Sequence, residues 1–156
     1  MRSANEAARA WYLKARDEGD QFDRFVYLWF AFNILYSEFM NNDERWAIRK
    51  FTEKRVLNIR NVEQILNHED SRYFVRRIIR NCRIDNTQDT AELAAKLKNP
   101  RNHKNARFEA LVLILYQVRC NLFHGNKLFS SESDQEVVLH AANVLQMILG
   151  HWIQLR

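Results

Sequence analysis

The sequence contains few residues of the kinds that break helices or crosslink chains. Of its 156 residues, three are glycine and one is proline. Tight turns between strands usually use these two residues, so their scarcity predicts long helices. The two cysteines, Cys82 and Cys120, are too few for a disulfide framework or a zinc cluster. We therefore expect a reduced, cytoplasmic protein.

Long apolar runs are also missing. The longest nearly apolar run, residues 25–36, contains Asn33 and has twelve residues, whereas a helix needs about 20 to span a bilayer. Residues 1–10 hold two arginines and a glutamate, which does not fit the apolar core of a secretory signal. We expect no membrane partner.

What the sequence does contain is typical of a globular protein. Hydrophobic residues make up 47% and charged residues 28%, which argues against a disordered chain. The length suits one domain with a sizeable core. No repeat or linker divides the chain, so residues 1–156 are predicted to form a single domain.

Positive charge is concentrated in the middle of the chain. Residues 45–83 hold eleven Arg and Lys against four Asp and Glu, an excess of 11 − 4 = 7, whereas the whole chain has a formal charge of +5. Such a segment suits a polyanion such as RNA, although basic faces are more often ordinary solvated surface.

Apolar spacing predicts the helices. Residues 20–40 carry aromatic side chains three and four positions apart, the period of one helix face: Phe22, Phe25, Trp29, Phe32, Tyr36 and Phe39. This helix is apolar nearly all round, so we expect it in the middle of a bundle or shared with a second copy. The basic segment predicts two or three shorter helices. Their apolar positions are Phe51, Val56, Ile59, Val62, Ile65, Leu66, Phe74, Val75, Ile78 and Ile79.

The second half of the chain predicts three more helices. One covers residues 90–98 and ends at the break around Pro100. The next carries two stripes, one fully apolar and one that runs Val112, Tyr116, Arg119, Phe123, before Gly125 closes it. The last starts from a capping box of Ser133 and Glu136. The whole is predicted to be an all-α bundle of five to seven helices.

Arg119 and His124 stand out in this pattern. Arg119 occupies a position that its stripe would otherwise give to an apolar residue, so it needs an anionic ligand, a carboxylate or a cluster of carbonyls. His124, five positions later, can exchange a proton near neutral pH. The pair lies about 140° apart on an ideal helix, so it converges only if His124 lies on an unwinding last turn or if two subunits meet.

The segment "RCNLFH" (residues 119–124) resembles the Arg-x4-His signature of the HEPN domain family, small all-α domains found in prokaryotic toxins and RNA-processing proteins. The Gly-Asn-Lys that follows, the final helix after a polar loop and the aromatic stretch "FDRFVYLWFAFNILYSEF" (residues 22–39) are also similar to that family. The resemblance implies a metal-independent endoribonuclease that acts as a homodimer, with both motifs lining one cleft. It also implies a toxin or phage-defence role, with a possible antitoxin or nucleotidyltransferase partner.

The resemblance assigns roles to individual residues. Arg119 would clamp the phosphate, His124 would move the proton, and Asn121 would add a hydrogen bond while the RNA 2′-hydroxyl attacks. The expected RNA-binding residues are Lys127, Asn126, Arg76, Arg77 and Arg80. In some HEPN toxins a partner modifies a tyrosine two positions after the histidine, where this chain has Asn126.

Two alternatives stay open at this point. One is a non-catalytic HEPN-like module that binds nucleotide, RNA or a protein, and the other is a helical interaction protein in which Arg119 forms a buried ion pair. No glycine-rich phosphate loop or set of metal ligands is present, so no cofactor is expected. His103, Glu136 and His140 are interpreted as surface residues.

Overall fold

A computed structural model describes residues 3–81, 89–123 and 132–153, and within these ranges the chain is helical with no strand. The all-α prediction is confirmed, but the described part of the chain has eight α-helices, more than the five to seven expected. They are α1 (Ala4–Arg16), α2 (Gln21–Tyr36), α3 (Glu44–Lys54), α4 (Ile59–Asn67), α5 (Glu69–Arg76), α6 (Thr90–Lys98), α7 (Lys104–Phe123) and α8 (Glu132–Trp152), with a 3₁₀ turn, η1 (Ser37–Phe39), after α2.

The helix that the sequence pattern missed is α1. A capping box begins it: the Ser3 hydroxyl accepts from the Glu6 amide at 3.2 Å, and the Glu6 carboxylate accepts from the Ser3 amide at 3.1 Å. Its buried residues are Ala8, Tyr12 and Ala15. Two of these three are alanines, so the helix buries a face that carries little hydrophobic signal.

The aromatic helix is confirmed as a core element. Asp20 caps α2 by accepting from the Asp23 amide at 2.9 Å, and Phe25, Trp29 and Phe32 are buried. Phe30 faces outward, with 38% of its surface exposed, and its ring lies 5.0 Å from that of Trp11. The α-helix ends at Tyr36, earlier than expected, because the chain tightens into η1.

The basic segment forms three helices, α3 to α5, at the upper limit of the prediction. Val56, Ile59 and Ile78 are exposed, although the pattern placed them on apolar faces. Val56 lies beyond the end of α3, Ile59 is the first residue of α4, and Ile78 follows α5. All three lie at or beyond a helix end, so helical spacing does not predict whether they are buried. The predicted bounds of the next helix agree with α6 (Thr90–Lys98).

The last two helices carry most of the remaining core. The fully apolar stripe of α7, from Phe108 to Leu122, is buried as predicted. The predicted start of α8 is wrong: Ser133 already lies inside a helix that begins at Glu132, so it is not the N-cap. Gly125 lies outside the described residues. No helix in the described part of the chain is long and apolar enough to cross a membrane.

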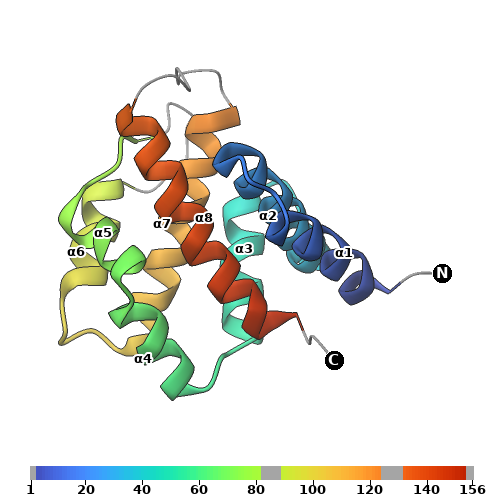
Figure 1. Cartoon of the computed structure of the whole chain (residues 1–156). Helices are drawn as coiled ribbons and strands as arrows, with labels where there is room; N and C mark the ends of the chain where they lie inside the picture. Colours follow the sequence, from blue (N-terminus) through green and yellow to red (C-terminus); the bar gives the residue numbers. More distant parts are fainter. Residues whose placement is uncertain (1–2, 82–88, 124–131, 154–156) are drawn as a thin grey trace.

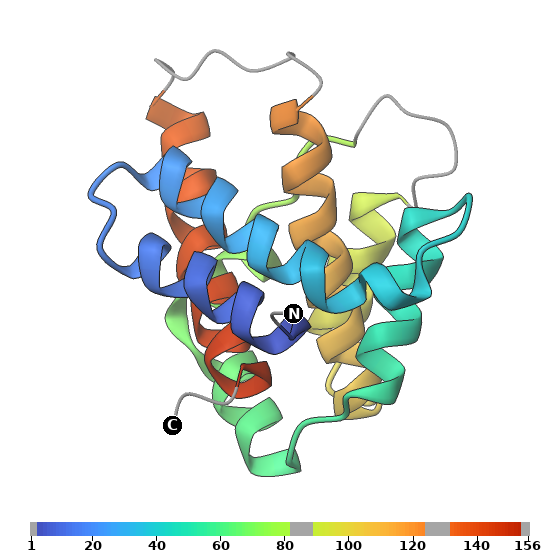
Figure 2. The ribbon, with the colours of Figure 1, turned by 90° about the vertical axis from the view of Figure 1, so that its right-hand side faces the viewer.

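The helices pack as a bundle around α7 and α8, which run in opposite directions (Figures 1 and 2). Helices α1 and α2 pack against each other and against α8 on one side, and α4 to α6 lie on the other side (Figure 1). Trp152 at the end of α8 is 2% exposed and packs against α2, α3 and α7. Its ring contacts Phe32, Phe51 and Phe108 at centroid distances of 5.5, 4.9 and 5.8 Å. This arrangement places the C-terminal end of α7 beside α2 and the start of α3.

Candidate functional site

Arg119 lies near the C-terminal end of α7 and forms an ion pair with the first residue of α3. Its Nη1 donates to Glu44 Oε1 at 2.8 Å, with 20% of the arginine side chain and 18% of the glutamate side chain exposed. Of the partners expected for this guanidinium, the structure shows a carboxylate. Both groups are partly accessible, so a ligand can reach them.

Aromatic rings surround the guanidinium. Its Cζ lies 5.8 Å from the ring centre of Trp29, 5.9 Å from that of Tyr116 and 4.9 Å from that of Phe123. Cation–π contacts of this kind attract a cation and leave its N–H groups in the plane free to donate. The second stripe of α7 becomes more accessible toward its end, since Val112 is buried and Phe123 is 42% exposed.

Glu44 is itself held by a buried hydrogen-bond chain. The Tyr36 hydroxyl donates to Glu44 Oε2 at 2.6 Å, and Asn33 Nδ2 donates to the same hydroxyl oxygen at 2.9 Å. Each carboxylate oxygen of Glu44 therefore has a donor, one from Arg119 and one from Tyr36. These hydrogen bonds hold the Glu44 carboxylate in place, and the carboxylate in turn positions Arg119.

Burial and neighbouring charge act on the acid–base groups of this site. Burial raises the pKa of Tyr36 far above its ordinary value, and the bond to Glu44 raises it further. Burial alone would lower the pKa of Arg119, but Glu44 and other neighbours outweigh that effect and leave it raised. Arg119 is therefore a permanent cation.

Tyr36 makes the stability of the fold sensitive to alkaline pH. Its folded pKa is raised, so its contribution is complete below about pH 10, where unfolded tyrosine ionises, and is lost as the pH rises above that value. We expect the melting temperature to fall less steeply between pH 9.5 and 11 in Tyr36→Phe than in the wild type. Thermal unfolding across this range, with Tyr27→Phe as the control, measures the slope, and equal slopes for Tyr36→Phe and wild type would contradict the assignment.

Asn121 points away from Arg119. Two positions on an α-helix are about 200° apart, and Asn121 Nδ2 donates to the backbone carbonyl of Arg80 at 2.8 Å. The side chain is buried. This bond ties the segment after α5 to the C-terminal end of α7, a positioning contact that the sequence pattern did not predict.

The predicted RNA-binding arginines lie along α5 and the segment after it. Arg76 and Arg80 are exposed, whereas Arg77 is partly buried and its Nη1 donates to the Tyr73 hydroxyl at 3.1 Å. The bond from Asn121 brings the backbone of Arg80 to the end of α7, on the flank opposite Arg119. His124, Asn126 and Lys127 lie outside the described residues, so the structure places neither the histidine of the motif nor its two neighbours.

His140 is not the surface residue that the sequence suggested. Its side chain is 18% exposed, its Nδ1 lies 2.7 Å from Asp70 Oδ1, and its ring stacks on Tyr73 with centroids 4.0 Å apart. The interpretation was wrong because Asp70 lies 70 positions away in the sequence and meets α8 only in the folded chain. Among the described residues, no group of three or more His, Cys, Asp or Glu side chains has the arrangement of a metal site.

Sequence reasoning did not identify Glu44 and Tyr36 as members of the site. Asp43 is the N-cap of α3, and its carboxylate accepts from the Trp46 amide at 3.2 Å. An N-cap residue in the sequence predicts where a helix starts, but it does not predict that the next residue, Glu44, contacts Arg119. Comparison of the chain with known protein families, curated proteins and solved structures found no match.

Proposed function

We propose that this chain is a metal-independent endoribonuclease of the HEPN type, in which Arg119 binds the scissile phosphate and His124 transfers the proton. The observation that carries the proposal is the partly exposed Arg119 guanidinium, fixed by Glu44 and aromatic rings. It lies five positions before the histidine of the motif in sequence. A fixed planar cation beside a proton-transfer group is what phosphodiester cleavage by an RNA 2′-hydroxyl requires.

Arg119 retains donors for a phosphate while it is paired. A guanidinium has five N–H groups, and the bond to Glu44 uses Nη1. Arginine binds phosphate oxygens through two parallel N–H bonds. Because Glu44 sets the orientation of the fork before RNA arrives, less freedom is lost on binding.

The same ion pair also supports an alternative. Glu44 supplies the carboxylate that a purely structural Arg119 would need, as in a helical interaction protein without catalysis. The two readings differ in their consequences: a structural pair contributes to folding alone, whereas a phosphate clamp is required for reaction with RNA.

The test is incubation of purified protein with single-stranded RNA in excess chelator. We expect cleavage, with products that end in a 2′,3′-cyclic phosphate, because the attacking nucleophile is the 2′-hydroxyl of the RNA itself. Absence of cleavage across RNAs of varied sequence would contradict the proposal and leave the structural reading of Arg119.

The proposal includes a homodimer whose cleft contains both motifs. Three large apolar side chains, just after η1 and on α3 and α7, are exposed: Met40 by 45%, Trp46 by 43% and Phe123 by 42%. Phe123 contacts the Arg119 guanidinium, and Trp46 follows Glu44 in the first turn of α3. We expect light scattering to give the mass of two chains, about twice 18.8 kDa. We also expect Phe123→Asp to shift the mass toward one chain, and a wild-type monomer at working concentrations would contradict the shared cleft.

A further inference from the structure

A second polar site lies between α1, α2, α8 and the start of α5, away from Arg119. It is an open pocket of about 530 Å³, within the size range of small-ligand sites. Its lining residues include Tyr12, Arg24, His68, Asp70, Asn143 and His151. None of these residues takes part in the Arg119 site.

Arg24 is the central cation of this pocket. Its Nε donates to Gln21 Oε1 at 2.8 Å, its Nη1 to Gln146 Oε1 at 2.7 Å, and its Nη2 to Asn143 Oδ1. All three acceptors are neutral amides, which fix the guanidinium without cancelling its charge. Burial lowers the pKa of Arg24, and the charge of the Asp70 carboxylate offsets this only in part, so the burial of the cation is not fully compensated.

Asp70 acts on Arg24 through its charge, while its carboxylate is bonded to other side chains. Oδ1 faces His140 Nδ1 at 2.7 Å and accepts from Asn143 Nδ2 at 3.2 Å. Oδ2 lies 3.3 Å from His68 Nδ1. Asn143 bridges the two residues, since its Oδ1 accepts from Arg24 Nη2 and its Nδ2 donates to Asp70 Oδ1.

Two imidazoles stand beside this cation. His151, on the last turn of α8, is exposed, and the His68 side chain is 48% exposed. His68 Nδ1 accepts from the Asp70 amide at 3.2 Å when neutral, and it can pair with Asp70 Oδ2 when protonated. In both states the other ring nitrogen of His68 remains for a ligand. Gly150 allows close approach to Tyr12, since a Cβ there would lie 3.3 Å from the Tyr12 hydroxyl.

We propose that this pocket binds the phosphate group of a small phosphorylated molecule, with Arg24 as the principal contact. Three of the five guanidinium N–H groups are bonded within the protein, and two remain for phosphate oxygens. A fixed arginine fork matches the geometry of phosphate oxygens. Among the described residues that line the pocket, Arg24, His68 and His151 are the basic side chains and Asp70 is the one carboxylate.

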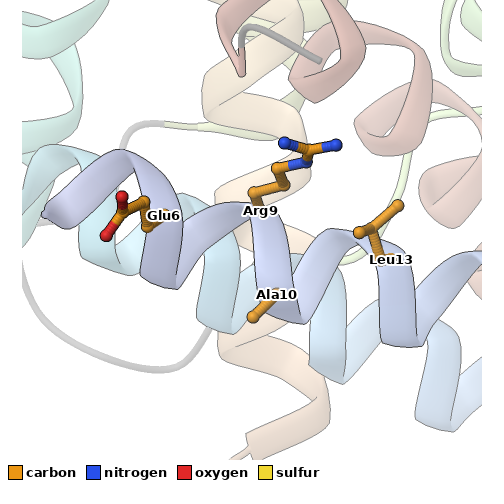
Figure 3. Close-up of a pocket in the computed structure, with 4 residues that line it drawn as sticks. All are labelled: Glu6, Arg9, Ala10 and Leu13. Carbon is orange, nitrogen blue, oxygen red and sulfur yellow. The ribbon is translucent and has the colours of Figure 1, made fainter. Parts of the chain in front are cut away.

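A hollow on the outer surface of α1 has no such convergence. It measures about 400 Å³ and is lined by Glu6, Arg9, Ala10 and Leu13, all from one helix (Figure 3). The Glu6 carboxylate is already used in the capping box of α1. The Arg24 pocket differs because residues from several helices surround one cation, whereas this hollow is only an exposed face of one helix.

The test is calorimetric titration of the full chain with inorganic phosphate, AMP and adenosine. We expect binding of phosphate and AMP but not of adenosine, because the contact is to the phosphate. Arg24→Gln should weaken binding at least about tenfold, the loss of one charge-assisted contact, and His151→Ala should weaken it by a smaller factor. Arg101→Gln, which removes an exposed arginine between α6 and α7, is the matched control and should bind as the wild type does.

Arg119→Ala separates this site from the proposed RNA site, because it should leave AMP binding unchanged. Loss of AMP binding in Arg119→Ala, or equal binding in wild type and Arg24→Gln, would overturn the proposal, as would no binding at millimolar ligand. If Arg24→Gln does not fold, Arg24→Lys and His151→Ala decide the question. Lysine keeps the charge but not the planar fork, so unchanged affinity in both of these variants would also overturn it.

Discussion

Arg119→Ala and His124→Ala are each expected to slow RNA cleavage in chelator by about 10²- to 10⁴-fold. The range is that of a lost proton-transfer group and of a lost donor to developing negative charge. Arg119→Lys should also be strongly impaired, because lysine keeps the charge but cannot form two parallel bonds to a phosphate. Initial rates on one RNA substrate, with circular dichroism to verify folding, measure the effect.

Two matched variants control for the loss of an arginine and of a histidine. Arg49→Ala removes an arginine that is paired with Glu109 at 2.9 Å but is 47% exposed. His103→Asn removes an imidazole at the opposite end of α7, where asparagine can replace its capping bond to the Asn105 amide. Both should cleave RNA within a few-fold of wild type. Unchanged cleavage in Arg119→Ala and His124→Ala would refute the site assignment.

Glu44 distinguishes a phosphate clamp from a structural ion pair. As a positioning residue, it should tolerate glutamine, which keeps an oxygen acceptor for Arg119, better than alanine, which leaves the guanidinium unheld. In the structural alternative, Arg119→Ala and Glu44→Ala lower the free energy of unfolding by similar amounts, roughly 1–3 kcal/mol for a partly buried pair. In the structural alternative, neither Arg119→Ala nor Glu44→Ala changes the rate of RNA cleavage.

Trp152→Ala is expected to produce the largest loss of stability, roughly 3–5 kcal/mol. The ring contacts three other aromatic rings from three different helices, and its Nε1 donates to the Arg55 carbonyl at 2.9 Å. In a domain of this size the loss corresponds to a melting temperature lower by roughly 6–20 °C. Chemical or thermal unfolding of the purified variant measures it.

Trp46→Ala is the matched control for this prediction. Trp46 is 43% exposed, so its removal should change stability by less than about 1 kcal/mol. Trp152→Phe should lie between the two, because it keeps an aromatic ring but leaves the Arg55 carbonyl without its donor. Equal effects of Trp152→Ala and Trp46→Ala would show that Trp152 does not join the helices as described.

Sequence periodicity predicted the parts of the fold whose buried faces are strongly apolar. The aromatic helix, the apolar stripe of α7 and the bounds of α6 followed from spacing and from Pro100. Helix α1 did not, because Ala8 and Ala15 bury little apolar surface. Ser133 was taken for a helix cap because the spacing to Glu136 fits a capping box whether or not the helix has already begun.

The sequence predicted individual residues of the candidate site, such as Arg119, but not the residues that they contact. The apolar stripe showed that Arg119 needs a partner, but the chain has 19 acidic residues, and Glu44 is 75 positions away. The same limit applies to the contact between Asp70 and His140. Such pairs depend on which helices pack together, which local periodicity does not encode.

The location of Glu44 makes its charge less dependent on Arg119. Glu44 is the first residue of α3, where the helix dipole presents partial positive charge, and the Tyr36 hydroxyl donates to its second oxygen. Under the proposal, a phosphate that shares the guanidinium would therefore destabilise this carboxylate less than it would a carboxylate in the middle of a helix.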